Sequence, residues 1–150
     1  MTTHTLRINA AQLSHTGPKD INEDAMALQL PQGHGLSSYT AAAAIADGLS
    51  SAEGGRIAAE TSVTNFINDF FATPSSWSVK TAGLKVLSAL NRWLHGQGQH
   101  YHHNHQGCLT TFTAFIIRGN TGHIFHVGDS RLYRLRENDW ECLTKDHALI

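Results

Sequence analysis

The chain lacks a surplus of charge of either sign, since 11 Lys and Arg residues face 12 Asp and Glu residues among 150. A nucleic-acid-binding protein normally shows a basic surplus, so composition argues against a nucleic-acid partner. The sequence also lacks any apolar run long enough to cross a bilayer. Its first residues lack the basic and then apolar order of a signal peptide. We therefore expect a cytoplasmic protein with no membrane contact.

Cysteine is scarce as well. Cys108 and Cys142 stand far apart and have no neighbours at metal-site spacing. This argues against a disulfide framework and against a zinc site built on cysteine. We expect both cysteines to be small buried apolar residues.

Histidine, by contrast, is abundant, with 11 in the chain and a dense group between His95 and His105. The segment 96–107 is polar, aperiodic and flanked by glycine, which is typical of a mobile loop. A histidine-rich metal carrier is the alternative. It predicts tight nickel or zinc binding that is lost when residues 100–105 are deleted.

Length and a 41% share of hydrophobic residues indicate one globular domain, or part of a larger one. The chain is organised around residues 39–59. There an apolar run ends at Asp47-Gly48, and Ser50 then lies three residues before Glu53, the spacing of a capping box that opens a helix. Gly48 permits unusual dihedrals or the close approach of a ligand. From these residues alone, an ordinary Asp-Gly turn remains the alternative.

Hydrophobic periodicity predicts the other elements. Helices are expected from residue 51 to before Pro74 and from 79 to 95, with Gly96 as the C-terminal cap of the second. Because both helices have broad apolar faces, we expect them to pack on a sheet. Strands are expected at 6–10, 25–30, 39–46, 108–117, 123–127, 132–135 and 140–143.

Acidic residues stand at the ends of these predicted strands. Glu23 and Asp24 come at the entrance to the strand at 25–30, Asp47 ends the next strand, and Asp129 lies at a glycine-marked break. Such residues are often solvated loop charges. Carboxylate oxygens are also the ligands that hard divalent cations prefer, so the pattern is compatible with a metal site.

The order of the motifs carries a resemblance that no single motif carries. The sequence resembles the metal-dependent protein phosphatases of the PP2C type, and most closely the amino-terminal phosphatase domain of bacterial kinase/phosphatase fusions. The motifs, which span nearly the whole chain, are Asn22-Glu23-Asp24, Ala46-Asp47-Gly48-Leu49, Thr110-Thr111, Val127-Gly128-Asp129-Ser130-Arg131 and Leu143-Thr144-Lys145-Asp146-His147.

The resemblance implies an α+β fold, a sandwich of two antiparallel sheets flanked by helices, with two or three Mn²⁺ or Mg²⁺ ions at the sheet edges. In the family pattern Asp47 bridges two metals, Gly48 gives its carbonyl to one, and Glu23 serves the other directly or through water. Asp24 would hydrogen-bond metal-bound water. Asp129 matches the ligand of a third, weaker metal.

The reaction that the resemblance implies is hydrolysis of phosphoserine and phosphothreonine in proteins. A hydroxide bridging two cations would attack phosphorus, with Asp47 and Glu23 as the catalytic metal ligands. The expected partners are phosphorylated proteins and a protein kinase domain, fused or neighbouring, in bacterial signalling. The alternative is a catalytically inactive, phosphatase-like module that binds and regulates a kinase.

Two departures from the family pattern bear on this expectation. Lys19 stands where the family usually has an arginine that grips the substrate phosphate, and a lysine binds phosphate only as a point charge. The family also continues for roughly a hundred residues beyond the position of Ile150. We therefore expect residues 1–150 to be the amino-terminal part of a phosphatase domain, inactive alone and prone to pair through open strand edges.

Overall fold

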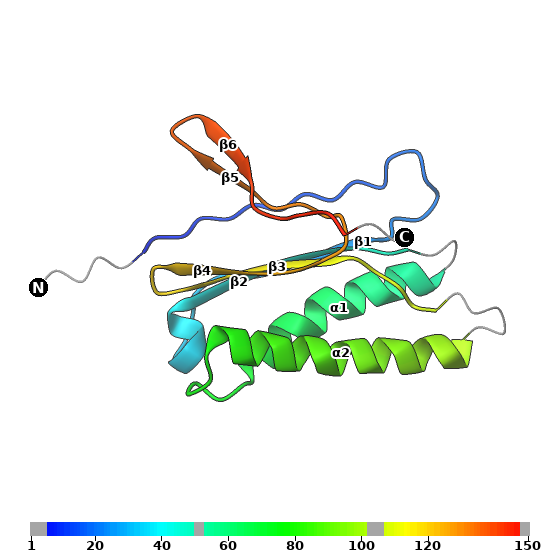
Figure 1. Cartoon of the computed structure of the whole chain (residues 1–150), viewed down its shortest axis with the longest axis horizontal. Coiled ribbons are helices and arrows are strands. Elements are labelled where there is room, and N and C mark those ends of the chain that lie inside the picture. Colours follow the sequence, from blue (N-terminus) through cyan, green and yellow to red (C-terminus); the bar gives the residue numbers. More distant parts are fainter. Residues whose placement is uncertain (1–5, 50–52, 102–106, 148–150) are drawn as a thin grey trace, which may run out of the picture.

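The computed structural model describes residues 6–49, 53–101 and 107–147. One four-stranded antiparallel sheet, two long helices and a separate two-stranded hairpin make up the fold (Figure 1). The elements are β1 Asp24–Gln29, the 3₁₀ helix η1 Gly35–Ser38, β2 Thr40–Asp47, α1 Glu53–Phe71, α2 Val79–Tyr101, β3 Phe112–Arg118, β4 Thr121–Val127, β5 Tyr133–Arg136 and β6 Asp139–Cys142.

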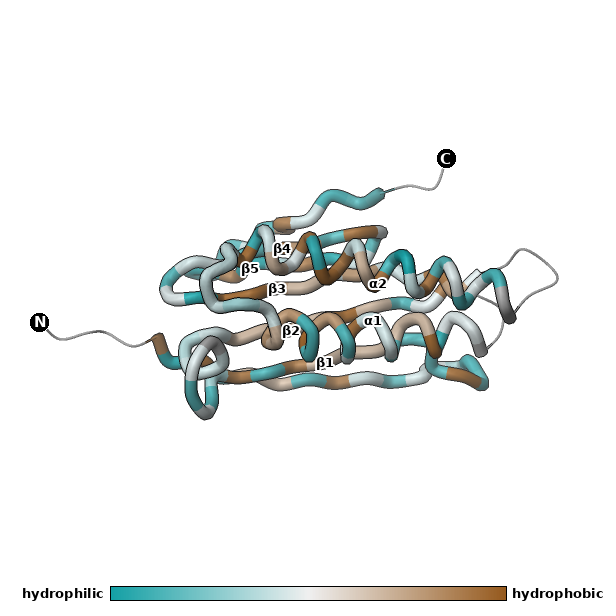
Figure 2. The backbone as a smooth tube through the Cα atoms, turned by 90° about the horizontal axis from the view of Figure 1, so that it is seen from below, coloured by the Kyte–Doolittle hydropathy of each residue, from teal (hydrophilic) through white to brown (hydrophobic). Residues whose placement is uncertain are grey.

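The four-stranded sheet has the order β1-β2-β3-β4, and both helices lie side by side on one of its faces (Figure 1). Figure 2, seen from the side of the helices, shows apolar stretches along the strands behind them. The predicted packing of both helices on a sheet is confirmed. No helix in the described part of the chain is long and apolar enough to cross a membrane.

The alanine-rich run at 39–46 forms strand β2, as predicted. Alternate residues of β2 face the helices and are buried, among them Ala42, Ala44 and Ala46. Because these side chains are small, α1 packs close to the sheet and places Phe66 and Phe70 in the core. Phe66 meets Phe112 of β3 edge to face, with ring centroids 4.9 Å apart.

Gly48 is explained by packing rather than by an unusual dihedral angle. A Cβ atom built on Gly48 would lie 2.3 Å from the carbonyl oxygen of Gly55, in the first turns of α1. The close approach predicted from the missing Cβ therefore takes place between β2 and α1 within the chain. The predicted capping box involves Ser50, which lies outside the described residues.

The end of α1 and the start of α2 agree with the prediction, whereas the start predicted at residue 51 lies outside the described residues. Helix α1 ends before Pro74, and α2 begins at Val79 after Ser78, whose hydroxyl accepts a hydrogen bond from the Thr81 amide at 3.1 Å. The prediction that Gly96 ends α2 is wrong, because the helix continues to Tyr101.

The extension of α2 also corrects the loop expected at 96–107, since residues 96–101 are helical and 102–106 lie outside the described residues. Glycine serves another purpose here. A Cβ on Gly98 would lie 2.9 Å from the Cα of Gly107, so the missing side chain lets the returning chain pass close to the helix.

The strand predicted at 6–10 is also wrong. This segment runs along the open face of the sheet, opposite the helices, and forms no strand (Figure 1). Ile8 and Ala10 line a cavity of about 210 Å³ with Leu28 and Phe115 of the sheet. Among the described residues no strand lies beside this segment to complete a hydrogen-bonded ladder, so the alternating sequence does not form a strand.

The β5–β6 hairpin turns at Glu137 and Asn138, which have φ angles of 50° and 67°, as a type I′ turn requires. One face of the hairpin carries apolar residues, including Leu135 and Trp140, and the other carries charged ones. Cys142 lies on the apolar face and is exposed, so the prediction that it is buried is wrong, whereas Cys108 is buried as predicted. The hairpin exposes this face because it projects away from the main sheet (Figure 1).

Candidate active site

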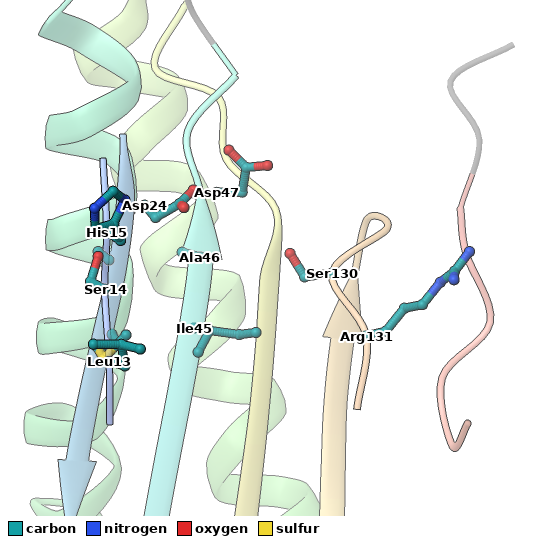
Figure 3. A pocket seen from close by; sticks show the side chains of 11 residues that line it. Leu13, Ser14, His15, Asp24, Ile45, Ala46, Asp47, Ser130 and Arg131 are labelled. Atoms are coloured by element: carbon teal, nitrogen blue, oxygen red, sulfur yellow. The ribbon is translucent and has the colours of Figure 1, made fainter. Parts of the chain in front are cut away.

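Strand pairing brings two of the predicted acids together. Asp24 begins β1, Asp47 ends β2, and the antiparallel register places them directly opposite each other. Directly paired residues project from the same face of a sheet, here the open face. Figure 3 shows the two carboxyl groups beside each other. The sequence predicted both acids at strand ends, and the strand register brings Asp24 and Asp47 into contact.

Backbone contacts add Glu23 and Gly48 to this edge. The Gly48 amide donates a hydrogen bond to the Glu23 carbonyl at 3.1 Å. The Glu23 carboxylate oxygen Oε1 is buried and has no hydrogen-bond partner among the described residues. A buried carboxylate oxygen without a partner is costly, which makes this atom a candidate cation ligand.

The pKa of Asp47 reflects the burial of its carboxyl group and the charged residues around it. Partial burial is the largest cause that raises the pKa of Asp47, followed by the charge of Asp24 and a hydrogen bond with it. The charge of Asp129 acts in the same direction, while Lys19 lowers the pKa. The fold therefore gathers three carboxylates and one lysine, with the anionic charge only partly compensated.

Thr111 connects Asp47 to the next segment of the site. Its hydroxyl accepts a hydrogen bond from the Asp47 amide at 2.9 Å, and its own amide donates to the Asp47 carbonyl at 2.9 Å. The same hydroxyl lies 2.8 Å from the hydroxyl of Ser130, the residue after Asp129. Sequence reasoning noted Thr110-Thr111 only as a motif. Two consecutive threonines inside the strand predicted at 108–117 were the available signal in the sequence.

The break that carries Asp129 is held by the segment after β6. The His147 amide donates to the Gly128 carbonyl at 2.8 Å, and the Gly128 amide donates to His147 Nδ1 at 3.2 Å. Gly128 has a φ of 108°, which favours glycine. The chain therefore bends at this point and aims the Asp129 loop toward Thr111.

Arg131 is bound away from the acids. Its guanidinium donates two hydrogen bonds to the carboxylate of Asp146, at 2.9 and 2.6 Å. The hydrogen bond from Arg131 is the largest cause that lowers the pKa of Asp146. Figure 3 shows Arg131 pointing away from Asp24 and Asp47. This pair fixes the segment after β6 and leaves Lys19 as the cation nearer to Asp47.

A cleft of about 370 Å³ opens beside the acids (Figure 3). The N-terminal segment contributes Ser14 and His15, which sequence reasoning did not place at the site as binding residues. The Gly17 amide donates to His15 Nδ1 at 2.9 Å, so the neutral ring carries its proton on Nε2. The cleft residues are Leu13, Ser14, His15, Asp24, Ala25, Met26, Ile45, Ala46, Asp47, Ser130 and Arg131.

The donor chemistry of this edge fits a hard divalent cation. Oxygen ligands, an orphaned buried carboxylate oxygen on Glu23 and mutually repelling acids are what such a cation would satisfy. Within residues 6–49, 53–101 and 107–147, however, no three His, Cys, Asp or Glu side chains converge closely enough to hold a metal by themselves. A cation bound here therefore needs water or backbone oxygen to complete its shell.

Known protein phosphatases are similar to this chain in sequence and in fold. The family model described as Protein phosphatase 2C matches residues 11–148. The chain is similar to Protein phosphatase PhpP of Streptococcus pneumoniae, at 30% identity over 108 residues, which are 71% of this chain and 43% of that protein. It is also similar to Serine/threonine protein phosphatase PstP of Mycobacterium tuberculosis, at 40% identity over 45 residues, 30% of this chain and 9% of that protein.

Among solved structures, the S. agalactiae serine/threonine phosphatase superposes with a TM-score of 0.73 at 27% identity, covering 87% of this chain and 52% of that one. The structure of PstP/Ppp from Mycobacterium tuberculosis gives 0.68 at 24% identity, covering 91% and 53%. The chain thus spans about half the length of these relatives.

Proposed function

The chain belongs to the protein phosphatase 2C family, and from this premise we propose that it is the amino-terminal part of a metal-dependent phosphatase that hydrolyses phosphoserine and phosphothreonine in proteins. The predicted family and the predicted α+β fold are both confirmed. The single observation that carries the proposal is the pairing of Asp24 with Asp47 beside the orphaned oxygen of Glu23.

The proposed ligands are oxygen atoms at the sheet edge. Glu23 and Asp47 would hold Mn²⁺ or Mg²⁺ through carboxylates and Gly48 through its carbonyl, while Asp24 would orient water and Asp129 would serve a further ion. When bound, such ions supply Lewis-acid chemistry, lowering the pKa of water and neutralising phosphoryl oxygens. The crowded carboxylates supply the charge that attracts the ions.

The remaining residues of the site would bind and orient the substrate. Lys19, whose charge reaches Asp47, is the proposed phosphate-binding residue. A lysine attracts a phosphate without the two-pronged geometry of arginine. Arg131 is occupied by Asp146 and is not assigned that role.

The proposed substrates are phosphorylated proteins, because the similar proteins are named as protein phosphatases and serine/threonine protein phosphatases. A protein kinase, fused or neighbouring, is the partner that we propose. Nothing in the described part of the chain favours an inactive kinase-binding module. The histidine-rich metal carrier stays untested, because residues 102–106 lie outside the described ranges.

The test is Mn²⁺-dependent hydrolysis of p-nitrophenyl phosphate and of a phosphothreonine peptide by an intact-length phosphatase domain that contains residues 1–150, with Asp47→Asn as the variant. We expect the variant to lose more than about a hundredfold in activity, the upper figure for losing a residue that only supports a metal ligand. Its thermal unfolding temperature without metal should not fall, because one repelling charge is removed. Wild-type turnover in Asp47→Asn would refute the assignment.

A further inference from the structure

Thr111 lies just beyond the regular β2–β3 ladder, where its side chain makes one of the hydrogen bonds that join the two strands. The regular pairing of these strands extends to Ile45 and Thr113. Two residues further along β2, the Asp47 amide donates to the Thr111 hydroxyl at 2.9 Å rather than to a backbone carbonyl. The last residue of β2, which carries a candidate ligand, is therefore held by the Thr111 amide, which donates to the Asp47 carbonyl, and by the Thr111 hydroxyl, which accepts from the Asp47 amide.

The same hydroxyl also reaches the loop of the second candidate ligand. It lies 2.8 Å from the Ser130 hydroxyl, directly after Asp129. On the other side of Asp129, a Cβ built on Gly128 would lie 2.7 Å from Thr111 Cβ and Cγ2. Thr111 is therefore in contact with the backbone before Asp129 and with the side chain after it.

Burial makes this connection rigid. Thr111 is 2% exposed, so neither hydrogen bond of its hydroxyl is readily replaced by water. Asp47 and Asp129 lie on different segments, so their relative placement depends on the contacts that join those segments. Thr111, 64 positions from Asp47 in the sequence, makes such contacts with both segments, and Thr113 adds a hydrogen bond of 3.3 Å to the Ser130 carbonyl.

We propose that Thr111 is a positioning residue whose hydroxyl sets the relative placement of Asp47 and the Asp129 loop, and thereby the affinity of this edge for divalent cations. The inference rests on the proposed function, because it assumes that these acids bind a cation. Thr111 touches neither cation nor substrate in this scheme. It acts through the two segments that it joins.

The test compares Thr111→Val, which keeps the shape and loses the hydroxyl, with Thr111→Ser, which keeps the hydroxyl and loses the methyl group. Mn²⁺ affinity of the same intact-length domain is measured by calorimetry, and unfolding by a thermal scan without metal. We expect Thr111→Val to weaken Mn²⁺ binding by about tenfold or more, the usual cost of losing a residue that supports a ligand. Thr111→Ser should bind like the wild type.

Thr40→Val is the matched control. Thr40 begins β2 at the opposite end, is fully buried, and its hydroxyl has no hydrogen-bond partner among the described residues. This variant should leave Mn²⁺ affinity unchanged, which separates the loss of a threonine hydroxyl in the sheet from the loss of this particular link.

The outcomes separate a failure of the proposed function from a failure of the positioning role of Thr111. If the wild-type chain binds no Mn²⁺, the proposed function fails. If it binds Mn²⁺ and Thr111→Val binds equally well, or if Thr111→Ser loses as much as Thr111→Val, the positioning role is overturned. If Thr111→Val does not fold, Ser130→Ala removes the same link from the other side, and unchanged affinity in that variant overturns the role.

Discussion

The two ends of the four-stranded sheet differ in how their polar side chains are placed: the acid end carries Asp24 and Asp47, and the packed end carries Thr40 and Arg118. At one end, Asp24 and Asp47 lie together and Thr111 ties the backbone of Asp47 to a distant loop. At the other end, Thr40 is buried without a hydrogen-bond partner for its hydroxyl, opposite Arg118 in the register. The first end accumulates like charge. The second relies on packing.

Arg118 illustrates the packed end. Its guanidinium donates to the Trp77 carbonyl at 3.1 Å and lies 5.6 Å from the centre of the Phe70 ring, while its Nε has no partner in the described ranges. A cation held against an aromatic ring stabilises a fold without creating a binding site. The comparison teaches that crowding of like charge, rather than polarity alone, distinguishes the end that carries the candidate site.

The largest structural effect is expected from a substitution at the acid end. Gly48→Ala places a Cβ against the Gly55 carbonyl and should destabilise the fold by about 1–3 kcal/mol, the usual cost of overpacking. It should also weaken Mn²⁺ binding, since β2 and α1 must separate beside Asp47. Chemical denaturation and calorimetry measure the two effects.

Gly96→Ala is the control for that variant. Gly96 lies within α2, and a Cβ there would meet no atom of the described residues within 4 Å. Alanine should therefore stabilise the helix by about 0.5–1 kcal/mol. A Gly48→Ala chain as stable as the wild type would contradict the close contact between β2 and α1.

Arg118→Met tests the packed end. Losing the hydrogen bond to Trp77 and the contact with Phe70 should cost about 1–2 kcal/mol of unfolding free energy. Mn²⁺ affinity should not change, because the substitution lies at the far end of the sheet. If Arg118→Met also lost Mn²⁺ affinity, the packed end would not be independent of the candidate metal site.

Lys19→Arg tests whether residue 19 binds the substrate phosphate at the acid end. An arginine fork should bind a phosphate bidentately and lower KM for a phosphopeptide by about three- to tenfold, or about 0.7–1.4 kcal/mol. The value of kcat should stay constant, because such a contact binds substrate and transition state alike. Steady-state kinetics separate the two constants, and an unchanged KM would remove Lys19 from the phosphate site.

The smallest effects concern pH without divalent cations. Because the pKa of Asp47 is raised in the folded state, its ionised form lowers stability at neutral pH, and this is relieved as pH falls through that pKa toward 3.8. Asp146 has a lowered pKa and the opposite sign, so it contributes stability that is lost only as pH falls through its folded-state pKa below 3.8.

Thermal scans of Asp47→Asn and Asp146→Asn against pH test these signs. Asp47→Asn should unfold at a higher temperature than the wild type at pH 7, with a difference that narrows toward pH 3.8. Asp146→Asn should be slightly less stable at pH 7, and salt should reduce that difference because the pair with Arg131 is exposed. If both variants changed the unfolding temperature at pH 7 in the same direction, the opposite signs expected for Asp47 and Asp146 would be wrong.

Local patterns in the sequence determined the elements and their faces. The bounded alanine run specified β2, Pro74 set the limit of α1, and the period of apolar residues placed both helices on the sheet. The acids fell at strand ends because turn-forming and acidic residues share those positions. Each of these features depends on neighbours a few residues away, which a sequence displays directly.

Tertiary structure decided what depends on a partner distant in sequence. The segment 6–10 alternates like a strand, yet it forms none without a neighbouring strand. Gly96 reads as a cap, but α2 continues past it, and the close approach of Gly107 falls at Gly98. The contacts of Asp47 with Asp24 and with Thr111 follow from strand register, and register is set by which faces become buried against other elements.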